Sequence, residues 1–175
     1  NGVNQNLKKI NHFLEYNGIL YVSCDFGIVQ YNLATSGFGD TYRIGDLGAE
    51  IKVSQTAISN GIIYAATSVG IKSASIINPN LNDYNQWAQV IGGGFSGVEI
   101  IGSQVIASSN WGQLFRLTGS VFTSFSTLPL VANDLRASGN YLLISTTTSV
   151  YIYNQNLSLV IQINSNQIPN ISAKF

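Results

Sequence analysis

The chain has 175 residues, of which only 9% are charged, and its formal net charge at pH 7 is zero. This length suits one domain of ordinary size, and the charge excludes recognition of nucleic acid or an anionic membrane through a positive field. One cysteine, Cys24, excludes an internal disulfide and a cysteine-based metal cluster. No apolar run is long enough to span a bilayer, so we expect no membrane insertion. The chain lacks an initiating Met and a signal peptide, which leads us to expect a mature form or an excerpt.

The first predicted elements are four short β-strands, at residues 10–16, 19–24, 28–32 and 40–44. Asn17 and Gly18 suit a type I′ hairpin, because both central residues of that turn need positive φ. Residues 25–27 form the next reversal, and the more polar fourth strand suits an outer edge. Four antiparallel strands in sequence make one blade of a β-propeller.

The same pattern recurs along the chain about every 40 residues, which is the spacing of propeller blades. It reads NGILYVSCDFGIVQYN at 17–32, NGIIYAATSVGIKSA at 60–74, GSQVIASSNWGQLFRL at 102–117 and GNYLLISTTTSVYIYN at 139–154. The second strand of each repeat is an almost continuous apolar run, which predicts a sheet covered on both faces. Blades stacked around an axis cover both faces in this way.

The sequence therefore predicts an all-β propeller with about four blades of four antiparallel strands and no helix. We place the blades at approximately 7–44, 51–90, 97–128 and 133–163, with the start of a further blade at 167–175. The predicted outer strands of the later blades are 86–90, 121–125 and 157–163, and Gly92-Gly93-Gly94 forms a crossing. Either the chain closes as a small ring or, as we favour, it is part of a larger one with two bare blade faces, through which copies could self-associate.

Several segments have a more specific resemblance. YVSCDFGIVQYNL, FGDTYRIG, EIKVSQTAI, NGIIYAATSVGIKSAS and NPNLNDYNQWAQV are similar in wording and order to the first β-propeller of the PorZ-like proteins of the type IX secretion system of Bacteroidetes. The resemblance is strongest over residues 9–90. The two-component-regulator propeller repeat of periplasmic sensors is a looser relative.

The resemblance implies a large envelope protein with two propellers and a C-terminal β-sandwich, located at the cell surface with the attachment complex. It also implies binding of an anionic lipopolysaccharide for presentation to a sortase. This chain would be roughly half of the first propeller. Family roles that belong to the other domains cannot be assigned to it.

Catalytic residues are scarce. The only histidine, His12, lies on the first strand, where a packed or hydrogen-bonded role is the more common one, and the eight acids are scattered through different repeats. NPNLND at 78–83 has alternating oxygens but a single carboxylate, which favours a turn over a calcium site. We therefore predict no enzyme activity, no metal and no cofactor.

Binding is the function that the pattern favours. Loops between second and third strands lie on one face of a propeller, and ligands commonly meet such faces. The candidate residues are Asp25, Phe26, Asn110, Trp111 and Arg136. Trp111 suits a sugar ring or a protein partner, with folding back onto a neighbouring blade as an even alternative. Arg136 suits an anionic ligand, with a structural pair to Asp134 or Asp25 equally compatible.

Trp87, by contrast, suits packing between blades.

The leading hypothesis is a non-catalytic module of a PorZ-like surface component that binds glycan or attachment-complex proteins at the cell surface, outer membrane or periplasm. The alternative is the ligand-sensing propeller of a periplasmic two-component regulator.

Overall fold

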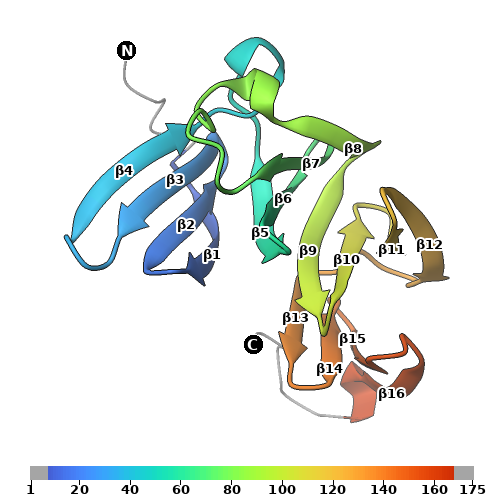
Figure 1. Ribbon diagram of the computed structural model, residues 1–175. Coiled ribbons are helices and arrows are strands. Elements are labelled where there is room, and N and C mark those ends of the chain that lie inside the picture. The colour runs from blue at the N-terminus through green and yellow to red at the C-terminus, as the bar shows by residue number, and fades with distance from the viewer. Residues whose placement is uncertain (1–7, 168–175) are drawn as a thin grey trace. The chain divides into compact units, whose positions relative to one another are not determined.

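The computed structural model describes residues 8–167, which form four antiparallel sheets of four strands each (Figure 1). Each sheet takes four consecutive strands in chain order. This confirms the predicted all-β propeller class. The chain divides into two compact units, Asn1–Phe95 and Ser96–Phe175, with the division falling at the start of β9.

The first unit contains the first and second sheets. The first sheet is β1 (Ile10–Tyr16), β2 (Ile19–Cys24), β3 (Gly27–Asn32) and β4 (Gly37–Tyr42), and the second is β5 (Val53–Ser59), β6 (Ile62–Thr67), β7 (Gly70–Ser75) and β8 (Ala88–Gly92). Asn17 and Gly18 have φ values of 51° and 77°, as the predicted type I′ turn requires. Asn60 and Gly61 repeat this geometry, with φ values of 50° and 73°.

The second unit contains the third and fourth sheets. The third sheet is β9 (Phe95–Ile101), β10 (Gln104–Ser109), β11 (Gln113–Thr118) and β12 (Val121–Thr127), and the fourth is β13 (Asp134–Ser138), β14 (Tyr141–Ser145), β15 (Ser149–Asn154) and β16 (Leu159–Asn164). The middle strands β10 and β14 are the most deeply buried, as their apolar runs predict.

The outer strands differ from the prediction because side chains shape the turns before them. The side-chain oxygen of Asn32 accepts hydrogen bonds from the backbone N–H groups of Ala34 and Thr35, so the turn is tight and β4 begins at Gly37 instead of residue 40. Asn154 accepts from Ser158 and extends its turn, which delays β16 to Leu159. Gly92 ends β8 and is not part of a three-glycine crossing.

Among the described residues no α-helix interrupts the strands, as the sequence predicts, and the helical segments are short 3-10 turns. η2 (Asp46–Gly48), η3 (Tyr84–Gln86) and η4 (Ser165–Gln167) are single turns. η3 delays β8, predicted to begin at residue 86, to Ala88, because the Asp83 side chain accepts the backbone N–H of Asn85 and caps this turn. The further blade predicted at 167–175 lies, apart from residue 167 in η4, outside the described residues.

The core of the first unit joins its two sheets. Tyr21, Ile28 and Tyr42 from the first sheet form one buried cluster with side chains that include Ile63 and Ala74 from the second. Trp87 belongs to this cluster and is only 4% exposed. Its indole N–H donates to the carbonyl of Leu81 at 2.9 Å, and its ring centre lies 6.0 Å from that of Tyr42. The prediction that Trp87 packs between blades is confirmed.

The core of the second unit is built in the same way. Ile106 and Leu114 from the third sheet cluster with residues of the fourth, namely Leu135, Leu142, Ile144, Tyr151 and Tyr153. The Tyr153 hydroxyl lies 3.1 Å from that of Ser126 on β12, so its polar end is also satisfied. Each unit therefore contains one complete sheet-to-sheet contact.

Candidate functional site

The loops between second and third strands have a shared design that the sequence analysis missed. Cys24, Thr67, Ser109 and Thr146 end the equivalent strands or directly follow them, and the last three carry a hydroxyl group. The Thr67 hydroxyl accepts the backbone N–H groups of Val69 and Gly70, and Thr146 does the same for Thr148 and Ser149. A hydroxyl residue at the same place in three repeats is the signal that identifies these turns.

The corresponding loop of the third sheet presents an exposed tryptophan. Trp111 is 69% exposed, and Asn110 beside it is also exposed. The Ser109 hydroxyl accepts the backbone N–H groups of Trp111 and Gln113 at 3.3 and 3.1 Å. The backbone of the loop is therefore fixed without any contribution from the indole, which leaves its face available to a ligand.

Gly112 brings a second segment beside this loop. Its φ is +79°, and a Cβ at this position would lie 2.6 Å from the carbonyl oxygen of Leu128 and 3.0 Å from that of Leu130. The link between β12 and β13 thus passes directly behind the loop, with Leu130 and Val131 42% and 39% exposed. We call Asn110, Trp111, Leu130 and Val131 the Trp111 patch. The sequence analysis did not include its two aliphatic members.

In the first unit, the predicted site residues Asp25 and Phe26 both contact other parts of the protein. The Asp25 carboxylate accepts a hydrogen bond from the Asn11 amide at 2.9 Å, and the same amide donates to the carbonyl of Val53 at 2.8 Å. Asp25 therefore helps to join the first sheet to the start of β5. Phe26 is 7% exposed and packs with Val22 and Cys24, so its expected place on the loop surface is wrong. Phe26 is the second residue of the two-residue turn between β2 and β3, and its ring can fold back onto the sheet that these strands belong to.

Arg136 is paired on its own strand. Its guanidinium Nε lies 3.0 Å from the Asp134 carboxylate, so the pairing with Asp134 is the one that forms. On β9, burial raises the pKa of Glu99, while hydrogen bonds from the backbone of Ile100 and Ala137 and the charge of Arg136 oppose that rise. One cation thus faces two carboxyl groups, which leaves little positive charge for an anionic ligand.

The first unit also contains the only histidine and the polar turn at 78–83. His12 is half-buried on β1. Nowhere between residues 8 and 167 do three histidine, cysteine or acidic side chains gather as metal ligands would. The oxygens of Asn78 and Asp83 accept backbone N–H groups within their own turn, as predicted for a turn cluster. None of the helical turns in this part of the chain has the length and apolar character of a membrane-spanning helix.

Comparison with protein families decides the kinship of the chain. Residues 1–88 match the model of the PorZ N-terminal β-propeller domain of the type IX secretion system. The chain belongs to this family. The matched PorZ region contains the first sheet and the first three strands of the second, which agrees with the resemblance seen over residues 9–90.

Solved structures show the same fold. PorZ, an essential bacterial surface component of the type IX secretion system of Porphyromonas gingivalis, is 15% identical with a TM-score of 0.72. The alignment covers 89% of this chain and 21% of the PorZ chain, so this chain spans about a fifth of that protein. The Neurospora crassa Pan2 WD40 domain is 10% identical with a TM-score of 0.66, covering 90% of this chain and 50% of that one.

A computationally designed protein, Ika4, is also similar in fold. It is 9% identical with a TM-score of 0.56, and the alignment covers 84% of this chain and 91% of Ika4. No curated protein sequence matches the chain.

Proposed function

We propose that this chain is a non-catalytic binding module of a type IX secretion surface component and that its Trp111 patch recognises cell-surface glycan. The family match over residues 1–88 supports the secretion role, together with the description of PorZ as a surface component. The observation that carries the binding role is the 69% exposure of Trp111 on a loop whose backbone is held by Ser109 and Gly112.

The chemistry of the patch favours a sugar ring over a charged group. An indole presents a flat apolar face, and Asn110 beside it supplies amide donors and acceptors for hydroxyl groups. Arg136 is neutralised by Asp134, and the whole chain has no net charge. For an anionic lipopolysaccharide, the carbohydrate ring and not its charged substituents would then contact this chain. Attachment-complex proteins are the other partners that an exposed aromatic and aliphatic patch suits.

The absence of catalysis is part of the same proposal. His12 is half-buried on a strand, the acids are dispersed, and Glu99 lies beside Arg136 and Asp134. Propeller domains such as those of PorZ and Pan2 are typically binding modules. A location at the cell surface follows from the same kinship.

Binding of purified anionic lipopolysaccharide to the chain and to Trp111→Ala tests the proposal by titration calorimetry. We expect the substitution to weaken binding by at least about tenfold, as removal of a central aromatic contact does. Val69→Ala is the matched control, because Val69 is exposed on the equivalent loop of the second sheet. It should leave the affinity unchanged.

Salt dependence separates the two modes of recognition. Stacking on a sugar ring predicts an affinity that changes by less than about threefold between 50 and 500 mM salt, because few charges are involved. Equal affinity of Trp111→Ala and the unmodified chain would refute the role of the patch. A steep loss of affinity with salt would instead indicate that charged groups carry the interaction.

A further inference from the structure

Two of the hairpin turns contain the pair Asn-Gly, which is chemically labile. Asn17-Gly18 joins β1 to β2, and Asn60-Gly61 joins β5 to β6. Both asparagines are exposed, and no atom lies within 4 Å of a Cβ built on either glycine, so solvent reaches both turn tips. An isoleucine follows the glycine in each case. The two turns can therefore be compared directly.

Deamidation is the reaction that such a pair undergoes. The backbone nitrogen of the glycine attacks the side-chain carbonyl carbon of the asparagine, and the new C–N bond closes a five-membered succinimide ring. The side-chain amide leaves as ammonia, which takes the proton of the glycine N–H. Water then opens the ring at either carbonyl and gives aspartate or isoaspartate. Glycine permits ring closure because it has no Cβ beside the attacking nitrogen. Water is the only other reactant.

The two turns differ in the partner of the attacking nitrogen. The Gly18 N–H donates a hydrogen bond to the Glu15 carboxylate at 2.7 Å. Ile58 occupies the place of Glu15 in the second sheet, three residues before Gly61 and at the same position in the strand register. The side chain of Ile58 cannot accept a hydrogen bond. Among the described residues, the nitrogen of Gly61 therefore lacks the carboxylate partner that Gly18 has.

The carboxylate opposes the reaction at Gly18 in two ways. Ring closure rotates the glycine nitrogen toward the asparagine side chain and out of its place in the hairpin, which breaks the charge-assisted hydrogen bond to Glu15. The nitrogen must also lose its proton, and negative charge that develops beside a carboxylate is disfavoured. Gly61 meets neither of these opposing effects, so its turn is the more reactive one.

We propose that Asn60 is a site of spontaneous deamidation in this protein and that Glu15 protects Asn17 from the same reaction. The two products affect the fold differently. Aspartate suits the same type I′ turn, whereas isoaspartate adds a backbone carbon to the turn between β5 and β6. The carbonyl of Gly61 accepts the backbone N–H of Ile76 at 2.9 Å, so isoaspartate also displaces this contact. Because β5 and β6 both contribute to the core of the first unit, the isoaspartate form should be the less stable one.

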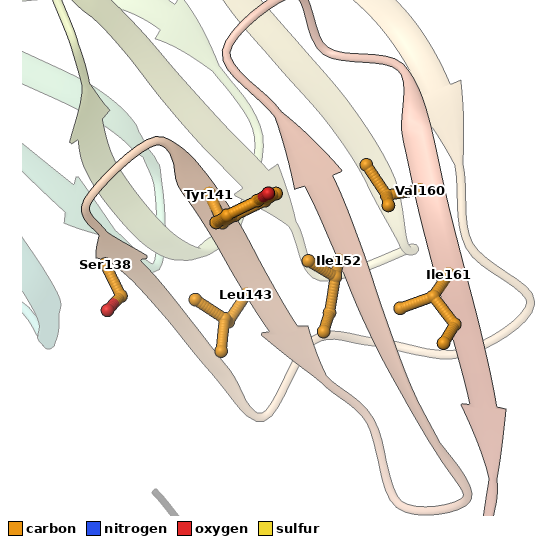
Figure 2. Close-up of a pocket in the computed structure, with 6 residues that line it drawn as sticks. All are labelled: Ser138, Tyr141, Leu143, Ile152, Val160 and Ile161. Carbon is orange, nitrogen blue, oxygen red and sulfur yellow. The ribbon is translucent and has the colours of Figure 1, made fainter.

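The fourth sheet supplies an asparagine that should resist the reaction. Its corresponding turn is Gly139-Asn140, and Figure 2 labels Ser138 and Tyr141, which stand on either side of this turn. Asn140 is exposed but precedes a tyrosine, whose Cβ crowds the attacking nitrogen. Its side-chain oxygen also accepts the Gln155 amide at 2.8 Å. Asn140 therefore separates exposure in a hairpin turn from the chemistry of Asn-Gly.

Peptide mapping by mass spectrometry, during incubation of the folded chain at neutral pH and physiological temperature, measures each site. Cleavage after lysine and arginine places Asn17, Asn60 and Asn140 on separate peptides, and also Asn1-Gly2, which lies outside the described residues. We expect Asn60 to convert at least about threefold faster than Asn17, as a lost hydrogen bond to a charged group predicts. Asn140 should stay intact. In denaturing urea the rates at Asn17 and Asn60 should be equal, because the bond to Glu15 is absent there.

Glu15→Ala tests the cause of the difference. Glu15 is exposed, so the fold tolerates the change, and the rate at Asn17 should rise to within about twofold of that at Asn60. Asp40→Ala is the matched control, because it removes an exposed carboxylate from the same sheet and should leave both rates unchanged. Circular dichroism would show that both variants keep their strands.

Four results would overturn the proposal. The first is equal conversion of Asn17 and Asn60, or faster conversion of Asn17, in the folded unmodified chain. The second is a difference between these sites that persists in urea, and the third is an unchanged rate at Asn17 in Glu15→Ala. The fourth is conversion of Asn140 as fast as that of Asn60, which includes the case in which neither converts.

Discussion

The two tryptophans occupy opposite environments in the two units. Trp87 in the first unit is 4% exposed, with its N–H bonded to Leu81 and its ring against Tyr42. Trp111 in the second unit is 69% exposed, on a turn that Ser109 and Gly112 complete without it. The difference shows that neighbours decide the role of a tryptophan. One indole fills a contact between sheets, and the other is exposed to solvent.

Removal of Trp87 should have the largest effect on stability. Trp87→Ala leaves a cavity between the first and second sheets, and we expect it to lower the free energy of unfolding by about 3–5 kcal/mol. Trp87→Phe keeps most of the apolar volume but leaves the carbonyl of Leu81 without its indole donor, so its cost should be smaller. Urea denaturation followed by circular dichroism measures both. Equal costs for the two variants would show that the hydrogen bond, and not the packing, holds this residue.

The next largest effect concerns the turn that presents Trp111. Gly112→Ala adds a Cβ that meets the carbonyl of Leu128, at a φ of +79° that disfavours any side chain. We expect a loss of more than about 2 kcal/mol in the free energy of unfolding. Gly119→Ala is the matched control, since its φ is +63° but no atom lies within 4 Å of the new Cβ. If both substitutions cost the same, the close approach of the link between β12 and β13 does not constrain the loop.

The sequence predicted Trp87 better than the loop around Trp111, for a physical reason. Strand spacing and turn residues such as Asn17-Gly18 are local, so they gave the four sheets and the packing of Trp87 between them. The burial of Phe26 and the approach of Leu130 to Gly112 depend on how the chain folds back, and no local pattern contains that information. The sequence allowed Arg136 to pair with either Asp134 or Asp25, and only the strand geometry brings Asp134 to it.

A buried cation in the first unit gives a third, smaller effect. The side chain of Lys72 is 5% exposed, and its ammonium group lies 3.0 Å from the carboxylate of Asp46, which is 93% exposed. Asp46→Ala leaves the ammonium without this partner, and we expect a loss of about 1–2 kcal/mol because water still reaches the Asp46 side. The double variant Lys72→Met with Asp46→Ala should recover most of that loss. Urea denaturation of the single and double variants at low and high salt would measure these losses. If the effects of the two substitutions simply add, Lys72 and Asp46 are not coupled.

In the second unit, Glu99 should make the stability of the chain depend on pH. Burial raises the pKa of Glu99 above its ordinary value of 4.5. A carboxyl group with a raised pKa binds its proton more tightly in the folded chain, so its contribution to stability falls as the pH rises from 4.5 through the raised value. Glu99→Gln should make the chain more stable at neutral pH and flatten this fall, while its amide oxygen still accepts the N–H of Ile100. Identical pH profiles for the variant and the unmodified chain would show that Glu99 gains no proton affinity on folding.

Trp111→Ala should have the smallest effect on stability, which sharpens the comparison between the two tryptophans. The indole is exposed, and the turn keeps its hydrogen bonds to Ser109, so the free energy of unfolding should change by no more than about 0.5 kcal/mol. The same variant is expected to lose glycan binding. A loss of stability approaching that of Trp87→Ala would mean that the indole packs onto the protein in solution, and weaker glycan binding would then reflect a damaged fold. Unchanged stability with weaker binding would assign the residue to the ligand, because only the contact with the sugar has been removed.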